Sequence, residues 1–148
     1  MTMKSMIAAA LVLAASPSFA AIELQPGEWQ TTETGTEDGK PVEPEVEKDC
    51  MSAAEARDAT GLVKDMRDQM QGQGAQCKTF DVKQSGETVS FVMKCGEPKQ
   101  FFFDMTGTFT LVSPTRYTGT MKTVVTMGNR TTTSDKKVEA VRVGACKK

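Results

Sequence analysis

The sequence predicts a mainly β protein of the α+β class, with an antiparallel meander that forms a curved sheet or partial barrel and one helix before the main strands. Three observations predict this fold. Apolar and polar residues alternate with period two in successive segments from Cys77 onward. Short turn sequences connect these segments, as they connect adjacent antiparallel strands. Apolar residues occur at helical spacing before Cys77. Strong curvature of the antiparallel sheet is the natural way to bury one of its faces.

The first twenty residues have the pattern of an export signal. Lys4 supplies a positive charge, residues 6–15 are a short apolar run, and residues 18–20 are a small-x-small cleavage site. We therefore expect a cleaved signal peptide at 1–20 and a single β-rich domain at 21–148, outside the reducing cytosol. No cysteine directly follows the cleavage site and no second apolar run has spanning length, so we expect neither a lipoprotein nor a membrane-spanning chain.

One or two strands are expected before the helix. Residues 28–36 are rich in threonine, and Trp29 is their apolar anchor. A turn cluster at 37–41 follows. Residues 42–48 alternate in polarity, but Pro44 lacks a backbone donor, so this segment is at best an edge strand.

The helix is predicted over residues 53–70. Ser52 and Glu55 have the spacing of a capping box, in which each side chain bonds the backbone N–H of the other residue. Gly61 weakens the middle of this helix by about 1 kcal/mol relative to alanine. The apolar positions form a narrow stripe at spacings of three and four, consisting of Leu62, Val63, Met66 and Met70.

Four to five strands are expected after Cys77, from the segments 78–83, 88–94, 100–112, 116–127 and 130–143. The third is the clearest half-buried strand, because its apolar residues share one parity: Phe101, Phe103, Met105, Phe109 and Leu111. These residues and Trp29 are candidates for either a packed core or the lining of an apolar pocket. Gly107 lies within this set and indicates a bend or bulge.

The four cysteines allow three pairings. Cys77 and Cys95 are each nine residues from Gly86, so a hairpin centred there places them opposite each other. A better match of apolar residues pairs Phe80 with Phe91 and Val82 with Val89, which shifts the register of the hairpin by one residue. A bulge would be needed to reconcile this register with the pairing of Cys77 and Cys95. Cys50 and Cys146 would then form the second disulfide. We expect both to be structural, because the chain has no Cys-x-x-Cys.

Charge is spread unevenly along a nearly neutral chain. Residues 21–50 contain nine acids and two bases, a net of −7, whereas residues 116–148 contain eight bases and two acids, a net of +6. Either these segments lie side by side and neutralise each other, or they form two exposed patches, one of them for an anionic partner. The small overall charge gives no support for a nucleic-acid partner.

The composition does not favour catalysis. The chain has no histidine, which removes the commonest general base and the commonest zinc ligand. No phosphate-binding glycine loop is present. The acidic residues Glu43, Glu45, Glu47 and Asp49 fit a solvated edge better than a calcium site, and the methionines fit core packing better than a copper site. We therefore expect no enzyme activity, no cofactor and no bound metal.

Several features resemble one family. They are the export signal, Pro26-Gly27-x-Trp29, Asp49-Cys50, Cys77, the hairpin from Gly86 to Cys95, Tyr117 and Gly144-Ala145-Cys146. Together they resemble domain of unknown function family 3617, whose members are small exported proteins of Gram-negative bacteria. The resemblance implies a periplasmic location and structural cysteines, and it implies no activity.

Two functions remain open at this stage. The first is a non-catalytic binding module for a small apolar or amphiphilic ligand, because the concave face of a curved sheet offers a pocket. The alternative is a structural or protein-interaction module of the cell envelope, which would use a sheet edge or the basic C-terminal surface.

Overall fold

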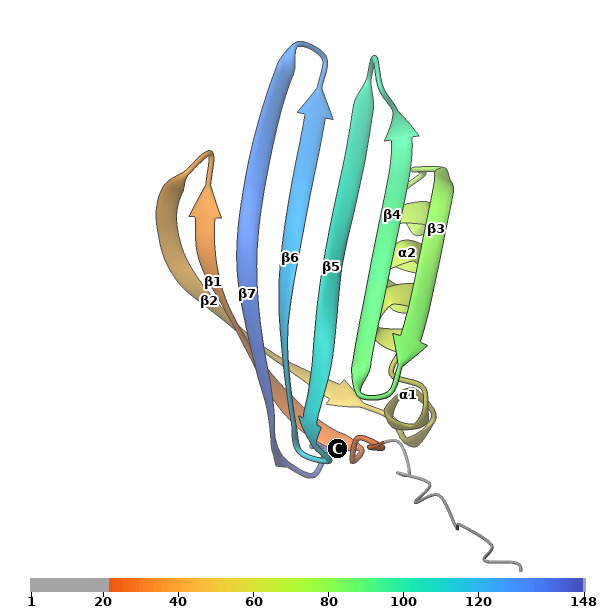
Figure 1. Cartoon of the computed structure of the whole chain (residues 1–148), viewed down its shortest axis with the longest axis vertical. Helices are drawn as coiled ribbons and strands as arrows, with labels where there is room; N and C mark the ends of the chain where they lie inside the picture. The colour runs from red at the N-terminus through yellow and green to blue at the C-terminus, as the bar shows by residue number, and fades with distance from the viewer. Residues whose placement is uncertain (1–21, 148) are drawn as a thin grey trace, which may run out of the picture.

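The structure is a computed structural model that describes residues 22–147, so the expected signal peptide at 1–20 lies outside the described residues. It shows seven strands in one sheet and two helices packed against it (Figure 1). In chain order the elements are β1 (Gly27–Glu37), β2 (Lys40–Met51), α1 (Ala53–Arg57), α2 (Gly61–Gly72), β3 (Cys77–Ser85), β4 (Thr88–Glu97), β5 (Phe101–Ser113), β6 (Arg116–Met127) and β7 (Arg130–Gly144).

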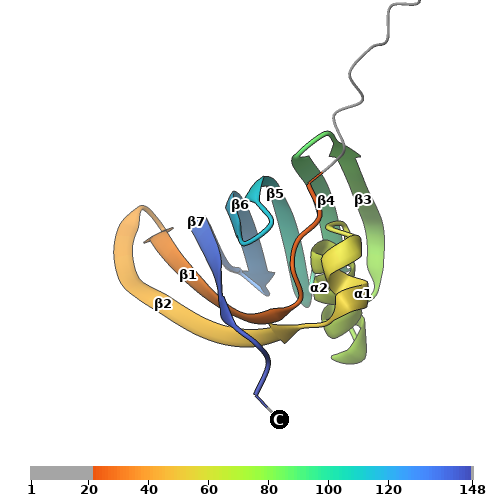
Figure 2. The ribbon, with the colours of Figure 1, turned by 90° about the horizontal axis from the view of Figure 1, so that it is seen from below.

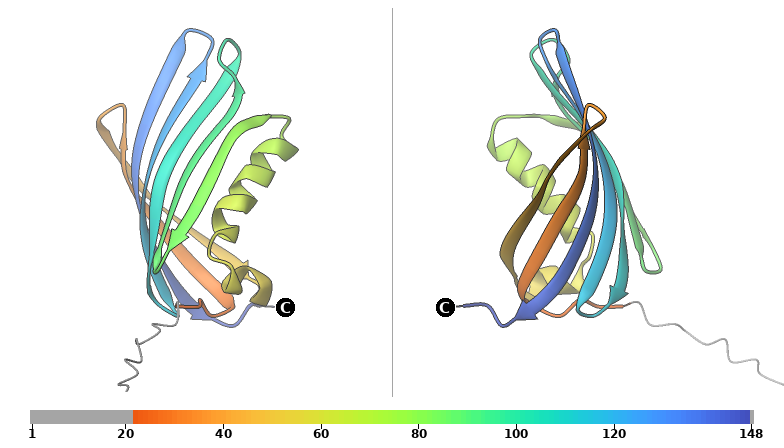
Figure 3. Two further views of the ribbon diagram at one scale, coloured as in Figure 1. Left: turned by 45° about the vertical axis from the view of Figure 1, so that its right-hand side comes forward. Right: turned by 90° about the vertical axis from the view of Figure 1, so that its left-hand side faces the viewer.

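The sheet is antiparallel throughout, in the order β2-β1-β7-β6-β5-β4-β3. The five strands from β3 to β7 form the predicted meander, and β1 joins the sheet through β7. Seen along its strands, the sheet curves into an open trough, and the two helices lie inside it (Figures 2 and 3). The predicted fold class is therefore confirmed, with the sheet open between the edge strands β2 and β3.

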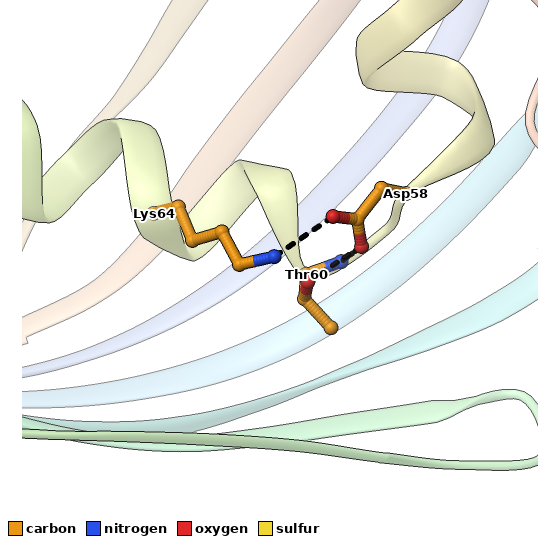
Figure 4. A network of polar contacts seen from close by, with 3 residues as sticks. All are labelled: Asp58, Thr60 and Lys64. Atoms are coloured by element: carbon orange, nitrogen blue, oxygen red, sulfur yellow. Dashed lines mark hydrogen bonds and ion pairs between the residues drawn. The ribbon is translucent and has the colours of Figure 1, made fainter.

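The prediction of one continuous helix is wrong, because the chain breaks it at Asp58 (Figure 4). The Asp58 carboxylate accepts hydrogen bonds from both the backbone N–H and the hydroxyl of Thr60, and from Lys64 Nζ at 2.8 Å. These hydrogen bonds lower the pKa of Asp58, and the bond from Lys64 has the largest effect. A short acidic side chain that bonds nearby backbone competes with helix propagation. Gly61 consequently begins α2 instead of weakening the middle of one helix.

The capping box is present as predicted. Ser52 Oγ accepts from the Glu55 backbone N–H, and the Glu55 carboxylate accepts from the Ser52 backbone N–H. This cap turns the chain sharply from the end of β2 into α1. It therefore fixes where the helical segment enters the trough.

The register of the β3–β4 hairpin was predicted in part. Cys77 pairs with Cys95 as expected, and the register then shifts between Cys77 and Thr79, in the direction opposite to the one that the apolar match requires. Beyond this shift, Phe80 pairs with Met93 and Val82 with Phe91, so the expected pairs with Phe91 and Val89 are wrong. The reason is the turn: Ser85 pairs with Thr88, and a two-residue loop fixes the register of a hairpin.

The oppositely charged ends of the chain lie side by side, because β1 pairs with β7 along its length. Glu33 lies 3.9 Å from Lys136, and Glu28 lies 3.9 Å from Lys147. Two of the nine acids of residues 21–50, Glu28 and Glu33, therefore have a basic partner from the C-terminal segment in the described structure. β2 continues this acidic side as the edge strand that was predicted despite Pro44.

A row of aromatic rings crosses the concave face. Successive ring centroids are 5.5, 5.8 and 5.7 Å apart along the series Trp29, Tyr117, Phe109 and Phe91. Glycines lie beneath two of these rings: a Cβ on Gly107 would come within 2.9 Å of Phe91, and one on Gly119 within 2.5 Å of Phe109. The β4–β5 register is continuous through Gly107, so the expected bend or bulge there is wrong. This glycine instead makes room for a ring.

Candidate functional site: a cleft between helix α2 and the sheet

The predicted core-or-pocket residues occupy different environments. Met105, Phe109, Leu111 and Trp29 are buried and belong to the hydrophobic core, which α2 joins through the fully buried Val63. Phe103 is half-buried against this core, and Phe101, the first residue of β5, is exposed. Of the six, Trp29 alone also lines the cleft described next. The phenylalanine-rich strand thus supplies mainly core.

A cleft of about 340 Å³ opens between α2 and the concave face of the sheet. We refer to it as the α2 cleft. Its floor is formed by buried side chains of the sheet, Trp29, Met51 and Tyr117, and one wall is formed by Leu62 and Met66. Its polar lining residues are Thr31, Asp49, Glu55, Asp65 and Gln69, and Cys50 completes the lining. The cleft therefore combines an apolar interior with a polar rim.

One face of α2 forms the helical wall. The α2 residues that line the cleft are spaced by three, one and three positions, so they lie on the same side of the helix. They are Leu62, Asp65, Met66 and Gln69. On the opposite wall, β2 ends at Met51, next to the capped turn into α1. The Cys50–Cys146 disulfide ties this end of β2 to the C-terminal segment. Both walls are thus held by local structure that does not depend on a ligand.

The aromatic floor is held in a fixed orientation. The indole Nε1 of Trp29 donates to the backbone oxygen of Gln25 at 3.0 Å, so its polar atom is satisfied. Ala140 in the intervening strand β7 is fully buried and small, which lets the rings of Trp29 and Tyr117 approach across it. Burial raises the pKa of Tyr117, and a hydrogen bond with Thr31 opposes that rise. Trp29 and Tyr117 both line the cleft, but their side chains are almost fully buried, so only a small part of each ring is accessible from it.

The charged rim of the cleft is acidic. Asp49 comes from β2, Glu55 from α1 and Asp65 from α2, and no basic residue is part of the lining that the structure describes. Desolvation raises the pKa of Asp65, and the nearby carboxylates of Glu55 and Asp68 raise it further. The hydrogen bonds with Ser52 lower the pKa of Glu55, which keeps that group ionised. The rim carries negative charge at neutral pH.

The acidic surface continues along the same face of β1 and β2. Thr31 and Glu33 of β1 lie opposite Glu47 and Glu45 of β2. Burial raises the pKa of Glu33, Lys136 opposes the rise, and Glu45 and Glu47 add to it. The trough is therefore apolar on the side of β4 and β5 and acidic on the side of β1 and β2.

A second hollow, of about 440 Å³, lies on the face of the sheet away from the helices. It is lined mainly by threonines, among them Thr108 and Thr120, whose hydroxyl oxygens are 3.3 Å apart. It has no aromatic residue in its lining as described. These features are those of an ordinary solvated β surface, so the α2 cleft is the better candidate for a site.

Sequence analysis did not identify this cleft. Apolar spacing in the sequence indicates Leu62 and Met66 and gives no signal for Asp65 and Gln69, the polar residues beside them. Met51 and Asp49 flank Cys50 and could have been found as the residues that its disulfide holds in place. Within residues 22–147, no three His, Cys, Asp or Glu side chains are grouped so that they could hold a metal ion. No helix in the described part is long and apolar enough to cross a membrane.

A family model described as Protein of unknown function (DUF3617) matches residues 24–146. The chain belongs to this family. The match to DUF3617 spans all seven strands, both helices and every residue of the α2 cleft. A search of curated proteins gave no match, and neither did a search of solved structures. The description of DUF3617 assigns no activity, so function has to be argued from the cleft.

Proposed function

We propose that this DUF3617 protein is a non-catalytic binding module of the periplasm and that a small amphiphilic ligand binds in the α2 cleft. The observation that carries the proposal is the pairing of an aromatic, buried floor with a polar rim. Small-molecule sites are typically concave and mostly apolar, with a few polar groups that fix orientation, and their volumes begin at roughly 300 Å³. The α2 cleft is concave, has an aromatic floor and polar groups at its rim, and reaches this lower volume at about 340 Å³, although its lining is at least as polar as it is apolar.

Rigidity also supports a binding role. The cleft is bounded by a capping box, a disulfide and a packed aromatic row, so little order has to be gained when a ligand enters. Preorganised sites lose less conformational entropy on binding. A site that only binds a ligand needs no mobile catalytic groups. The polar side chains at the rim are carboxylates, an amide and a hydroxyl, which can hold the polar end of a ligand.

The proposed compartment rests on two features. Residues 1–20 have the export pattern described above, and all four cysteines are paired, as Cys50–Cys146 and Cys77–Cys95. Disulfides persist in oxidising compartments such as the periplasm and are rare in the cytosol.

The alternative, a protein-interaction module, has weaker support. Basic residues of β6 and β7 pair with acids of the same sheet: Arg116 lies 3.0 Å from Glu139, and Lys136 lies 3.9 Å from Glu33. The free edge at β2 carries Pro41 and Pro44 and many acids. Prolines and charges on an edge strand oppose the addition of another strand. The β2 edge is therefore poorly suited to strand addition, and part of the basic charge of β6 and β7 is already paired within the sheet.

The proposal can be tested through Trp29, which is the single tryptophan and lies in the cleft floor. Titration of the oxidised protein with octan-1-ol should change its emission in a saturable way. Met66→Gln keeps the length of the side chain and makes the cleft wall polar, and it should abolish this change. Met121→Gln is the matched control, because Met121 is a half-buried methionine of β6 outside the cleft lining.

The predicted result is saturable binding in the wild type and Met121→Gln but not in Met66→Gln. Two results would contradict the proposal. One is equal binding by all three proteins, which would place the alcohol elsewhere. The other is the absence of saturable binding both of octan-1-ol and of charged octyl compounds.

A further inference from the structure

We propose that the α2 cleft selects cationic amphiphiles, in which an ammonium or guanidinium group is attached to a small apolar body. This inference rests on the proposed function and names the chemical class of its ligand. The apolar body would lie against the aromatic floor, and the positive group would lie at the rim.

The arrangement of the rim carries the inference. Asp49, Glu55 and Asp65 come from three different elements, β2, α1 and α2, and the fold brings them to one opening over Trp29 and Tyr117. A ligand seated on the floor therefore meets carboxylates on more than one side. Aromatic faces also attract cations, because the ring quadrupole is negative over the ring. Floor and rim thus favour the same sign of charge.

The rim charges are not neutralised by the protein itself. Other acids of the same segment have basic partners: Asp58 pairs with Lys64 at 2.8 Å and Asp68 with Arg67 at 2.7 Å. None of the ion pairs within residues 22–147 involves Asp49, Glu55 or Asp65. The bonds between Glu55 and Ser52 are to a neutral partner and leave the carboxylate charge in place. A ligand cation would therefore supply the missing counter-charge.

The acidic residues beside the cleft strengthen its preference for cationic ligands. Glu33, Glu45 and Glu47 extend the negative surface along β1 and β2, and within residues 22–147 the one ion pair of this group joins Glu33 to Lys136 at 3.9 Å. A concave surface lined by one sign of charge focuses the electrostatic potential and raises the local concentration of oppositely charged ligands. Anionic amphiphiles such as fatty acids would be repelled by the same surface.

Three probes of equal chain length separate charge from hydrophobicity: octylammonium, octan-1-ol and octanoate. Affinities are measured at neutral pH and low salt from the emission of Trp29. The inference predicts that octylammonium binds about tenfold more tightly than octan-1-ol and that octanoate binds more weakly than both. High salt should reduce the preference for octylammonium, because the rim is open to solvent and its charges are screened.

Two variants locate the effect. Asp49→Asn and Asp65→Asn should each weaken octylammonium binding about threefold and leave octan-1-ol binding unchanged. Glu43→Gln is the control, since Glu43 is an exposed acid of β2 outside the cleft, and it should change neither affinity. These substitutions are at exposed positions, so folding should be preserved, and the unchanged affinity for octan-1-ol checks this directly.

The outcomes distinguish the two proposals. If all three probes bind with equal affinity, charge selection is refuted and the amphiphile site stands. If octylammonium is preferred but Glu43→Gln weakens it as much as Asp49→Asn and Asp65→Asn do, the preference comes from overall charge and the assignment to the rim is refuted. If no probe binds saturably, both proposals are refuted.

Discussion

Gly119→Ala tests the packing of the aromatic row that forms the cleft floor and the core beside it. A Cβ at position 119 would lie 2.5 Å from Cδ1 of Phe109 and 2.9 Å from its Cε1, and 2.8 Å from the backbone oxygen of Thr108. Gly119 does not have a positive φ, so the cost of the substitution comes from crowding against the Phe109 ring and the Thr108 backbone oxygen and not from an unfavourable dihedral angle. Overpacking of a tight core costs about 1–3 kcal/mol. We therefore expect a loss of about that size, from a typical stability of roughly 5–15 kcal/mol.

Urea denaturation of the oxidised protein measures this loss. Gly144→Ala is the matched control, because Gly144 also lies in the sheet and a Cβ there meets nothing within 4 Å. It should change stability by no more than about 0.5 kcal/mol. Phe109→Leu removes the ring, so Gly119→Ala should cost less in that background, with a coupling of about 0.5–3 kcal/mol. Strict additivity, or no loss in Gly119→Ala alone, would show that the ring does not lie over Gly119.

Three further predictions concern stability. Ser52→Ala removes the capping side chain of α1 and should lower the free energy of unfolding by about 1 kcal/mol, as measured by urea melts, whereas an unchanged midpoint would mean that the cap contributes little. Glu33 has a raised pKa because it is desolvated, so its protonated form stabilises the fold at low pH and this stability is lost as pH rises through the raised pKa. Glu33→Gln should therefore raise the urea midpoint at pH 7 and leave it unchanged at pH 3, and a lower midpoint at pH 7 would mean that the ion pair with Lys136 dominates. Replacing Cys50 and Cys146 by serine opens a disulfide that joins residues 96 apart, which the chain-entropy model values at about 4–5 kcal/mol, and a loss below about 1 kcal/mol would contradict a structural role.

Local sequence patterns predicted most of the strands, the capping box and both disulfides. The strands and the cap depend on residues close in sequence, Cys77–Cys95 on symmetry about Gly86, and Cys50–Cys146 on being the pair that remains. The break at Asp58 could not be predicted from apolar spacing, because it is set by a polar side chain that bonds Thr60 and Lys64. The register of the β3–β4 hairpin was missed because the turn decided it over the apolar match.

The cleft itself required the three-dimensional structure. Trp29, Met51 and Tyr117 belong to three strands, and β7 separates β1 from β6. They form one floor because the sheet curves and because Ala140 in the intervening strand is small. The position of α2 across the trough then decides which helical residues face them. No local pattern encodes the curvature of a sheet together with the position of a helix against it.

Methionine-methyl NMR with octylammonium tests most directly whether an amphiphile binds in the α2 cleft. The chain has ten methionines, of which Met51 and Met66 line the cleft, whereas Met121 and Met127 lie on β6 away from it. Binding in the cleft predicts that the methyl resonances of Met51 and Met66 shift in a saturable way while those of Met121 and Met127 do not. Saturable shifts confined to Met121 and Met127, or the absence of shifts at Met51 and Met66, would contradict it.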